Sequence, residues 1–261
     1  MTQSQLNEVV DTFLAFWKTQ SPPPDRAVDV RTISLEEAYV VQRKVIEHRV
    51  ALGERVAGYK VGCTSTAIRE QFGLSEPICG RLMAPHVHYG ETELTWSDYV
   101  QCAVEPEFVL SIGKDVDDSV ADERELIDAI EWVAPGIEVH NFKFWFGDPS
   151  SQELIASNGI HAALVVGEQR MPPVEFDFDV EGVGIHRNGQ LMASGAGAQI
   201  MGGPLKSLRW LVRRLQEEGE YLRAGQLVIP GSPVELIPVS ANDRVTAAFT
   251  HLGRVATFFS G

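Results

Sequence analysis

The sequence lacks the features that mark membrane, secreted and disulfide-rich proteins. No apolar run approaches the roughly 20 residues that a membrane-spanning helix needs, and no basic region followed by an apolar core opens the chain, so we expect no secretory signal. The chain has only three cysteines, Cys63, Cys79 and Cys102, and they lack metal-type spacing. We therefore expect a cytoplasmic protein with reduced thiols and no membrane partner.

Positive charge is also scarce. The chain has 22 Lys and Arg against 36 Asp and Glu, which gives a formal net charge of −14. Nucleic-acid binding needs clustered Lys and Arg, so this balance argues against nucleic acid and anionic membrane as partners. A small anionic substrate remains compatible, provided that a bound metal ion supplies local positive charge.

The hydrophobic pattern predicts helices first and strands later. Apolar residues recur at helical spacing over residues 4–18 and 35–52, and Ser34 with Glu37 forms a capping-box pattern. Residues 121–133 are predicted to be an amphipathic helix, and the chain beyond Ile160 is mostly strands with turns, apart from a helix that starts at Pro204. We predict an α+β protein with a helical N-terminal segment, residues 1–55, and one β-rich domain, residues 56–261.

Two glutamates alternate within an apolar strand. Glu105 and Glu107 are two residues apart in the run 104–110, so both side chains point to the same face. Burying both carboxylates costs several kcal/mol each unless a charge offsets them, and Mg²⁺ prefers such oxygen ligands. Glu138, which follows a second apolar run, could supply a third carboxylate. The alternative interpretation is a solvent-facing edge strand with alternating glutamates.

Three further features are candidates for the site. Lys60 lies in the predicted strand 56–62, where its side chain either extends to solvent or faces a cavity; burial there would lower its pKa towards a value useful for proton transfer. Gly231 and Ser232 form a predicted tight turn whose backbone N–H groups could hold a carboxylate. Trp145 and Phe146, in an aromatic loop, are predicted to cover a substrate tail or to contact another subunit.

Several of these stretches together resemble one known family. They are Gly58–Ser65, Glu76–Gly80, Val104–Glu107, Pro135–Val139, Asn188–Gly189 through Gly195–Ala198, and Gly203–Leu205. The set resembles the hydratase/decarboxylase branch of the fumarylacetoacetate hydrolase superfamily, in order and over nearly the whole chain. The resemblance implies a mixed β-roll or barrel core with a helical N-terminal part, assembled into homo-oligomers.

The resemblance also assigns residues. The family's Glu-x-Glu and later Glu bind Mg²⁺ or Mn²⁺ and correspond to Glu105, Glu107 and Glu138. The family's lysine, an acid/base or substrate-orienting group, corresponds to Lys60. The activity implied is that of a divalent-metal-dependent hydratase, a lyase that adds water to 2-hydroxy-2,4-dienoate or 2-oxo-enoate acids of aromatic meta-cleavage type and gives 4-hydroxy-2-oxo acids.

The chain departs from the family pattern at two places. Hydratases often have Pro-Asp where this chain has Pro77-Ile78, which is closer to the decarboxylases. In the family's Ala-Asp-Asn-Ala-Ser-like stretch, this chain has Ser157 for Asp and Ile160 for Ser. Ser157, Asn158 and His161 are therefore candidates to bind substrate, with Gly231 and Ser232. The alternatives that stay open are a 4-oxalocrotonate-type decarboxylase and a non-catalytic oxo-acid-binding member.

Overall fold

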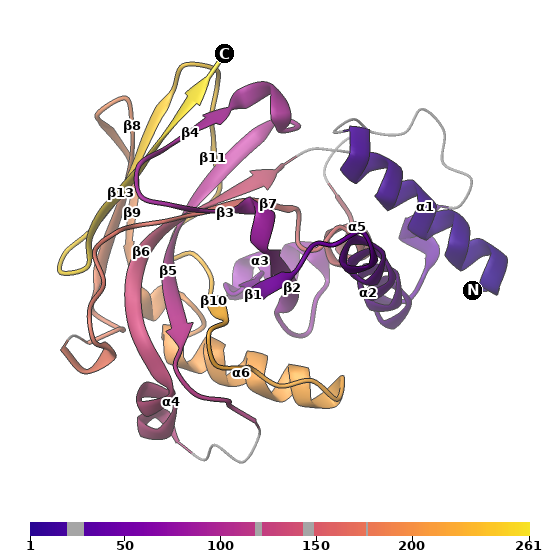
Figure 1. Ribbon diagram of the computed structural model, residues 1–261, viewed down its shortest axis with the longest axis horizontal. Helices are drawn as coiled ribbons and strands as arrows, with labels where there is room; N and C mark the ends of the chain where they lie inside the picture. The colour runs from indigo at the N-terminus through magenta and orange to yellow at the C-terminus, as the bar shows by residue number, and fades with distance from the viewer. Residues whose placement is uncertain (20–28, 118–121, 143–148, 176) are drawn as a thin grey trace.

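The computed structural model describes residues 1–19, 29–117, 122–142, 149–175 and 177–261. Its β-strands form two sheets, and helices cover one side and one end of the molecule (Figure 1). Trp145 and Phe146, which we predicted to cover a substrate tail, lie outside the described residues. The described helices are α1 Gln3–Thr19, α2 Leu35–Ala51, α3 Thr66–Phe72, α4 Glu123–Ala129, α5 Ser151–Ala156 and α6 Pro204–Glu217.

The larger sheet has eight strands and the smaller has five among the described residues. In the eight-stranded sheet the order is β2-β1-β10-β5-β6-β7-β3, and β11 pairs with β5; in the five-stranded sheet it is β4-β13-β12-β8-β9. The strands are β1 Val56–Gly62, β2 Ile78–Met83, β3 Val87–Tyr89, β4 Thr92–Thr95, β5 Cys102–Ile112, β6 Ile130–Asn141, β7 His161–Val166, β8 Gly182–Arg187, β9 Gln190–Ala196, β10 Leu227–Ile229, β11 Ile237–Pro238, β12 Arg244–Phe249 and β13 Gly253–Ser260.

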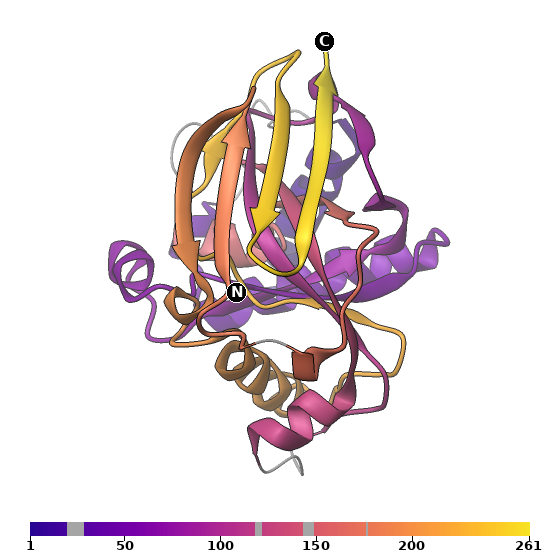
Figure 2. The same ribbon diagram turned by 90° about the vertical axis from the view of Figure 1, so that its left-hand side faces the viewer.

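The two sheets pack face to face through the longest strands. Figure 2 shows the five-stranded sheet in front of β5 and β6. Phe108 on β5 meets Phe249 on β12 edge to face, with ring centroids 5.2 Å apart, and lies 6.3 Å from the ring of Phe178. Such aromatic contacts bury large apolar area between layers. The predicted α+β class, with a mixed β core and a helical N-terminal part, is confirmed.

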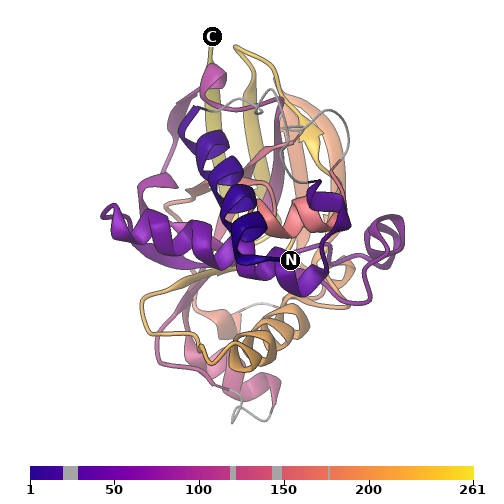
Figure 3. The same cartoon turned by 90° about the vertical axis from the view of Figure 1, so that its right-hand side faces the viewer.

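The N-terminal helices close one side of the eight-stranded sheet. In Figure 3, α1 and α2 cross in front of the strands. Helix α2 begins with the predicted capping box, in which Ser34 and Glu37 each accept a hydrogen bond from the other's backbone N–H. Residues of both helices belong to the same hydrophobic core as the strands. The division into residues 1–55 and 56–261 stays a prediction. None of the described helices combines the length and apolarity that a membrane crossing requires.

The strand that follows α4 starts earlier than the sequence predicts. We expected a helix over residues 121–133, but α4 ends at Ala129 and β6 runs from Ile130 to Asn141. Ile130, Trp132 and Val133 fit a helical period, but β-branched and aromatic residues also suit a strand, and here they pair with β5. The tertiary pairing therefore overrides the local pattern and makes β6 a continuous 12-residue strand.

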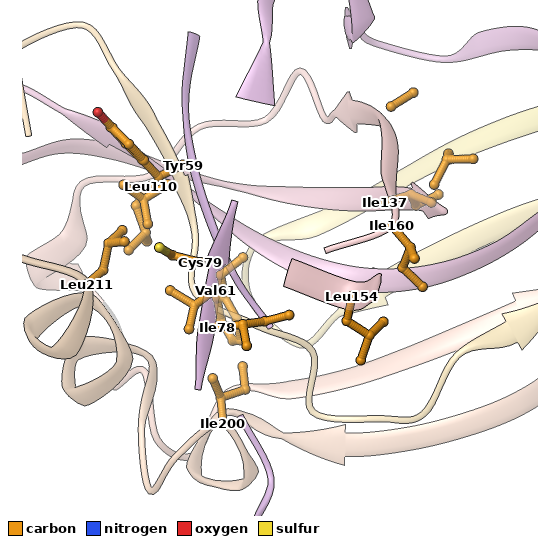
Figure 4. Packing of buried hydrophobic residues seen from close by; sticks show 14 of the residues in the cluster. Tyr59, Val61, Ile78, Cys79, Leu110, Ile137, Leu154, Ile160, Ile200 and Leu211 are labelled. Carbon is orange, nitrogen blue, oxygen red and sulfur yellow. The ribbon is translucent and has the colours of Figure 1, made fainter. Parts of the chain in front are cut away.

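The two faces of the eight-stranded sheet bury different residues. One face carries the main core, part of which Figure 4 shows: Tyr59 and Val61 of β1 lie near Leu110 of β5 and Leu211 of α6. The other face carries a small cluster, which consists of Leu82, Val109, Ala134, Leu164, Val166, Leu227 and Ile229. Because strand side chains alternate, Lys60, Glu105, Glu107 and Glu138 share this second face.

Candidate metal centre and active site

The three predicted carboxylates converge on neighbouring strands. Glu105 of β5 is paired directly with Glu138 of β6, and Glu107 lies two residues further along β5 on the same face. Strand β5 is central, between β10 and β6, and Glu107 and Glu138 are 1% and 0% exposed. The alternative of a solvent-facing edge strand is therefore excluded. Acidic groups opposite one another in a buried sheet repel, which favours binding of a cation between them.

Lys60 lies within this acidic cluster. Its ammonium nitrogen is 2.6 Å from Oε1 of Glu138 and donates a hydrogen bond to the carbonyl of Gly159 at 3.1 Å. Burial disfavours the charged ammonium, but attraction by Glu138, with smaller contributions from Glu105 and Glu107, outweighs it and raises the pKa of Lys60. The prediction of a lowered pKa is wrong: burial acts in that direction, but the prediction left the three carboxylates out of the balance.

Glu107 is the carboxylate whose negative charge is poorly compensated by its surroundings. Burial and repulsion from Glu138 and Glu105 raise the pKa of Glu107 well above its ordinary value, against the weaker opposing effects of Lys60 and of a hydrogen bond from Gly231. The Gly231 N–H donates to Oε2 of Glu107 at 3.1 Å. The predicted carboxylate-binding turn thus holds a carboxylate of the protein itself. Gly231 has φ +120°, and a Cβ there would lie 2.6 Å from the side chain of Thr64.

Two histidines complete the cluster. His161 Nδ1 lies 2.8 Å from Oε1 of Glu138, and burial lowers the pKa of His161 to about 4, despite this carboxylate. The imidazole is therefore neutral near pH 7, and its Nδ1–H donates to Glu138. His140 Nε2 lies 3.2 Å from Oε2 of Glu105 and 3.4 Å from Oε2 of Glu138.

A divalent cation fits this set of donors. One ligand atom from each of Glu105, Glu138 and His140 lies within 4.8 Å of the others. Oε2 of Glu138 is buried and has no hydrogen-bond partner among the described residues. An unpartnered carboxylate oxygen in a buried acidic cluster is costly unless a cation binds it. Of the predicted ligands, Glu105 and Glu138 belong to this compact group, and Glu107 lies beside it.

Sequence reasoning missed His140. His140 is not among the predicted site residues, and it is the penultimate residue of β6. The signal was available in the alternation of the strand: His140 follows Glu138 by two residues and therefore shares its face.

The turn before β7 positions the side chain of Lys60. Asn158, Gly159 and Ile160 have φ values of +64°, +65° and +53°. The Asn158 side chain accepts a hydrogen bond from the Arg81 N–H at 2.6 Å and donates to the Arg81 carbonyl at 2.8 Å. A left-handed conformation is unfavourable for the β-branched Ile160, by roughly 1–3 kcal/mol. The two hydrogen bonds to β2 thus help to hold a strained turn whose Gly159 carbonyl binds Lys60.

The other predicted substrate-binding side chains also make contacts within the protein. Ser157 Oγ donates to the carbonyl of Leu154 and accepts from the N–H of Ile160, so it closes the end of α5. Ser232 Oγ accepts a hydrogen bond from the N–H of Val234. Their roles towards substrate, with those of Asn158, His161 and Gly231, stay predictions.

Cavities lie beside His161. A cavity of about 440 Å³ is lined by His161 and Asn141 together with His86, His88 and other residues of the β2–β4 region. A second cavity, of about 50 Å³, is lined by Ser157, Asn158, Ile160 and His161 and by aromatic residues of α1. Ile78, which is 3% exposed, pairs with Gly62 and so shares the face of Lys60. Ile78 therefore places an apolar side chain at the position where the family resemblance implies an acid in many hydratases.

Comparisons with known proteins place these observations in context. A scan against models of protein families found no match. The chain is 31% identical over 226 residues to the TodF product hydratase of Pseudomonas putida, covering 87% of this chain and 84% of that protein. It is 30% identical over 229 residues to a 4-oxalocrotonate decarboxylase of a Pseudomonas species, covering 88% of each.

A solved structure is similar over nearly the whole chain. The 4-oxalocrotonate decarboxylase from Pseudomonas putida G7, complexed with magnesium and adipate, superimposes with a TM-score of 0.93 at 25% identity. The match covers 99% of this chain and 98% of that one. The relatives therefore include both a hydratase and a decarboxylase, at similar identity.

Proposed function

Because this chain belongs to the hydratase/decarboxylase branch of the fumarylacetoacetate hydrolase superfamily, we propose that Glu105, Glu107 and Glu138 hold Mg²⁺ or Mn²⁺ and that Lys60 moves the substrate proton. The chain is a metal-dependent lyase of this family. The observation that carries the proposed roles is the convergence of Lys60 with Glu138 and Glu105 on one buried face. Its substrate is a 2-hydroxydienoate or the corresponding 2-oxo acid of aromatic meta-cleavage type.

A divalent cation held by these carboxylates would act as a Lewis acid on the substrate carboxylate and 2-oxo group, and would stabilise the negative charge that develops there by several kcal/mol in the transition state. The buried carboxylates determine where the cation would lie. Glu107, held by the Gly231 N–H, cannot turn away from the cluster without breaking this hydrogen bond. The preorganised position of the acids lowers the cost of reorganisation when substrate binds.

Lys60 starts as the charged ammonium, because its pKa lies above the ordinary value. It is therefore a proton donor in the resting protein and a base only after it has given that proton away. Its hydrogen bond to Gly159 fixes the direction of the N–H groups. This arrangement suits interconversion of the dienol and oxo forms, in which carbon gains a proton as the 2-hydroxyl group loses one, and the reverse.

The hydratase reaction adds water at C4 and gives a 4-hydroxy-2-oxo acid. His161 lies beside both the acidic cluster and a cavity of about 440 Å³. Its neutral ring donates from Nδ1, and Nε2 has no hydrogen-bond partner among the described residues. We propose that Ser157, Asn158, His161, Gly231 and Ser232 surround the substrate, with His161 closest to the reacting atoms.

One observation favours a second candidate, a 4-oxalocrotonate-type decarboxylase. Ile78 stands on the face of Lys60, where hydratases of the family often have an acid that would orient water. Decarboxylation needs the same stabilisation of negative charge at the 2-oxo group but no added water. A non-catalytic oxo-acid-binding role is the third alternative, and the buried Lys60–Glu138 pair argues against it.

Incubation with Mg²⁺ and each of two substrates separates these functions. Loss of 2-hydroxypenta-2,4-dienoate absorbance with formation of 4-hydroxy-2-oxopentanoate supports the hydratase. Release of CO₂ from 4-oxalocrotonate, without hydration of the pentadienoate, supports the decarboxylase. Binding of both acids by calorimetry without turnover would identify a non-catalytic binder. The Glu105→Gln variant is the control, because its activity on either substrate should be lost.

We also propose that the protein is a cytoplasmic homo-oligomer, as the resemblance implies. Large apolar side chains on the surface support an interface: Tyr89 on β3 is 57% exposed, and Leu191 on β9 is 53% exposed. Light scattering on the purified chain tests this proposal. A mass of one subunit, 28.8 kDa, at all concentrations would contradict it.

A further inference from the structure

We propose that His140 contributes an imidazole nitrogen to the metal site, next to the carboxylates of Glu105 and Glu138. The chain then has a mixed nitrogen and oxygen donor set, which favours Mn²⁺ over Mg²⁺ more strongly than carboxylates alone do. This inference rests on the proposed function, because it assumes that the cation binds at the acidic cluster.

The position of His140 in the sheet directs its ring at the carboxylates. His140 lies two residues after Glu138 on β6 and is paired with Ala103 of β5, so its diagonal neighbour on β5 is Glu105. Ala103 is fully buried and has no side chain beyond Cβ to fill the space in front of the ring. The small cross-strand neighbour thus leaves His140 room to reach Glu105.

The distances fit ligands of one cation. His140 Nε2 is 3.2 Å from Oε2 of Glu105 and 3.4 Å from Oε2 of Glu138. Ligands at right angles around a cation, each at about 2.1 Å from it, lie roughly 3 Å apart. The three atoms therefore need only small movements to bind one ion.

The hydrogen bonding of His140 points the same way. The His140 side chain is 3% exposed, and neither ring nitrogen has a hydrogen-bond partner within the described part of the chain. Oε2 of Glu138, the atom that faces His140, is unpartnered too. Buried polar atoms are nearly always hydrogen-bonded, so a group of unpartnered atoms at this spacing indicates a ligand that satisfies them.

Imidazole changes the preference of a metal site. Mg²⁺ takes oxygen ligands and retains its water, whereas imidazole nitrogen suits the first-row transition metals from Mn²⁺ upward. Replacing one oxygen donor by His140 should therefore weaken Mg²⁺ relative to Mn²⁺. The competing account is electrostatic: a charged imidazolium that bridges Glu105 and Glu138 and never binds metal.

Pulsed electron paramagnetic resonance of the Mn²⁺-loaded full chain tests the inference. We expect modulation from a directly bound ¹⁴N nucleus in the natural protein, absent from His140→Gln and retained in His186→Gln, a histidine on β8 in the other sheet. In calorimetry, the ratio of Mn²⁺ to Mg²⁺ affinity should fall at least tenfold in His140→Gln, and retained Mg²⁺ binding will show that the variant still forms the site.

The outcomes separate this inference from the proposed function. In one outcome, the natural protein binds Mn²⁺ without ¹⁴N modulation, and Glu105→Gln abolishes the binding. This result would overturn the role of His140 but would still support the metal site. Modulation that persists in His140→Gln would also overturn it. Mn²⁺ binding that is unchanged in both Glu105→Gln and His140→Gln would overturn the inference and the proposed metal site together.

Discussion

The ammonium nitrogen of Lys60 lies 2.6 Å from Oε1 of Glu138, so the proposed proton carrier and a proposed metal ligand form one buried ion pair. Their side chains are 3% and 1% exposed. Removing one partner of such a pair leaves the other charge uncompensated in a poorly solvated site. Proton transfer and metal binding are therefore coupled through Glu138, and variants at this site should change both stability and chemistry.

Replacing Lys60 by Ala should slow exchange of solvent deuterium into the substrate carbon next to the 2-oxo group. General acid–base groups contribute roughly 10²–10⁴-fold, so we expect a loss in that range. The metal-free variant should also be less stable by about 3–5 kcal/mol, because Glu138 loses its closest cation. The exposed Lys114→Ala is the control. Undiminished exchange in Lys60→Ala would remove Lys60 from the proton path.

Replacing Glu107 by Gln should raise the stability of the metal-free protein and lower the stability of the metal-bound protein. The raised pKa of Glu107 means that the folded protein holds this proton more tightly than the unfolded chain, so its ionisation destabilises the fold as pH rises. In the presence of EDTA, the Glu107→Gln variant should therefore be more stable than the natural protein, by an amount that grows above the unfolded pKa of about 4.3.

With saturating Mg²⁺ the order should reverse. The natural protein gains stability by binding the ion, whereas the Glu107→Gln variant binds it more weakly and gains less. Thermal unfolding in EDTA and in Mg²⁺ measures both changes in stability. The activity of the variant should fall together with its Mg²⁺ affinity. An unchanged metal requirement would exclude Glu107 from the site.

His161 predicts a pH dependence of the metal-free protein. Its pKa is lowered to about 4, so the folded state binds fewer protons than the unfolded state between that value and about 6.5. Stability from this residue is present above pH 6.5 and is lost as the pH falls towards 4. The loss amounts to at most roughly 3 kcal/mol, from 1.36 kcal/mol per pKa unit.

Urea unfolding of His161→Gln in EDTA checks the sign. The stability of the natural protein should fall more steeply than that of the variant as the pH is lowered from 6.5 to 4. His186→Gln, in the five-stranded sheet, should follow the natural protein. Parallel curves for the natural protein and His161→Gln would show that His161 is not held neutral.

Asn158 is expected to position Lys60 through the left-handed turn. Asn158→Ala removes both hydrogen bonds to Arg81 and frees the Gly159 carbonyl that holds Lys60. We expect kcat to fall about tenfold or more, with little change in Mg²⁺ affinity, because a displaced proton donor costs rate and not metal ligands.

Asn188→Ala supplies a matched control. Asn188 also has a positive φ, +52°, and its side chain also makes two hydrogen bonds, with Asp243 and Arg244, but in a hairpin turn of the five-stranded sheet. This variant should lose stability without loss of kcat. Equal losses of kcat in both variants would mean that Asn158 acts only through stability.

The sequence predicted those parts of the fold that depend on local pattern. The capping box of Ser34 and Glu37 fixed the start of α2, and alternation placed Glu105 and Glu107 on one face. Local pattern also made Glu138 and Lys60 candidates, but only the family resemblance joined them with Glu105 and Glu107 in one site. Local pattern failed at residues 130–133, which fit a helical period as well as a strand.

The electrostatics of the site could not be predicted from sequence. The pKa of Lys60 depends on carboxylates of β5 and β6. These strands are distant from β1 in sequence, and the sheet places them on the far side of β10 from it. The N–H group of Gly231 is directed to Glu107 by the same long-range arrangement. His140 was missed because the length of β6 depends on its pairing with β5, and only the extended strand places that ring beside Glu105.

The most direct test of the account is anomalous diffraction from crystals of the protein soaked with Mn²⁺ and oxalate, a stable mimic of the 2-oxo acid group. The account predicts one strong Mn²⁺ peak within coordination distance of Glu105 and Glu138, with oxalate bound on its open side and facing Lys60. An empty acidic cluster at saturating Mn²⁺, or a peak elsewhere on the chain, would contradict the claim that these carboxylates form a catalytic metal site.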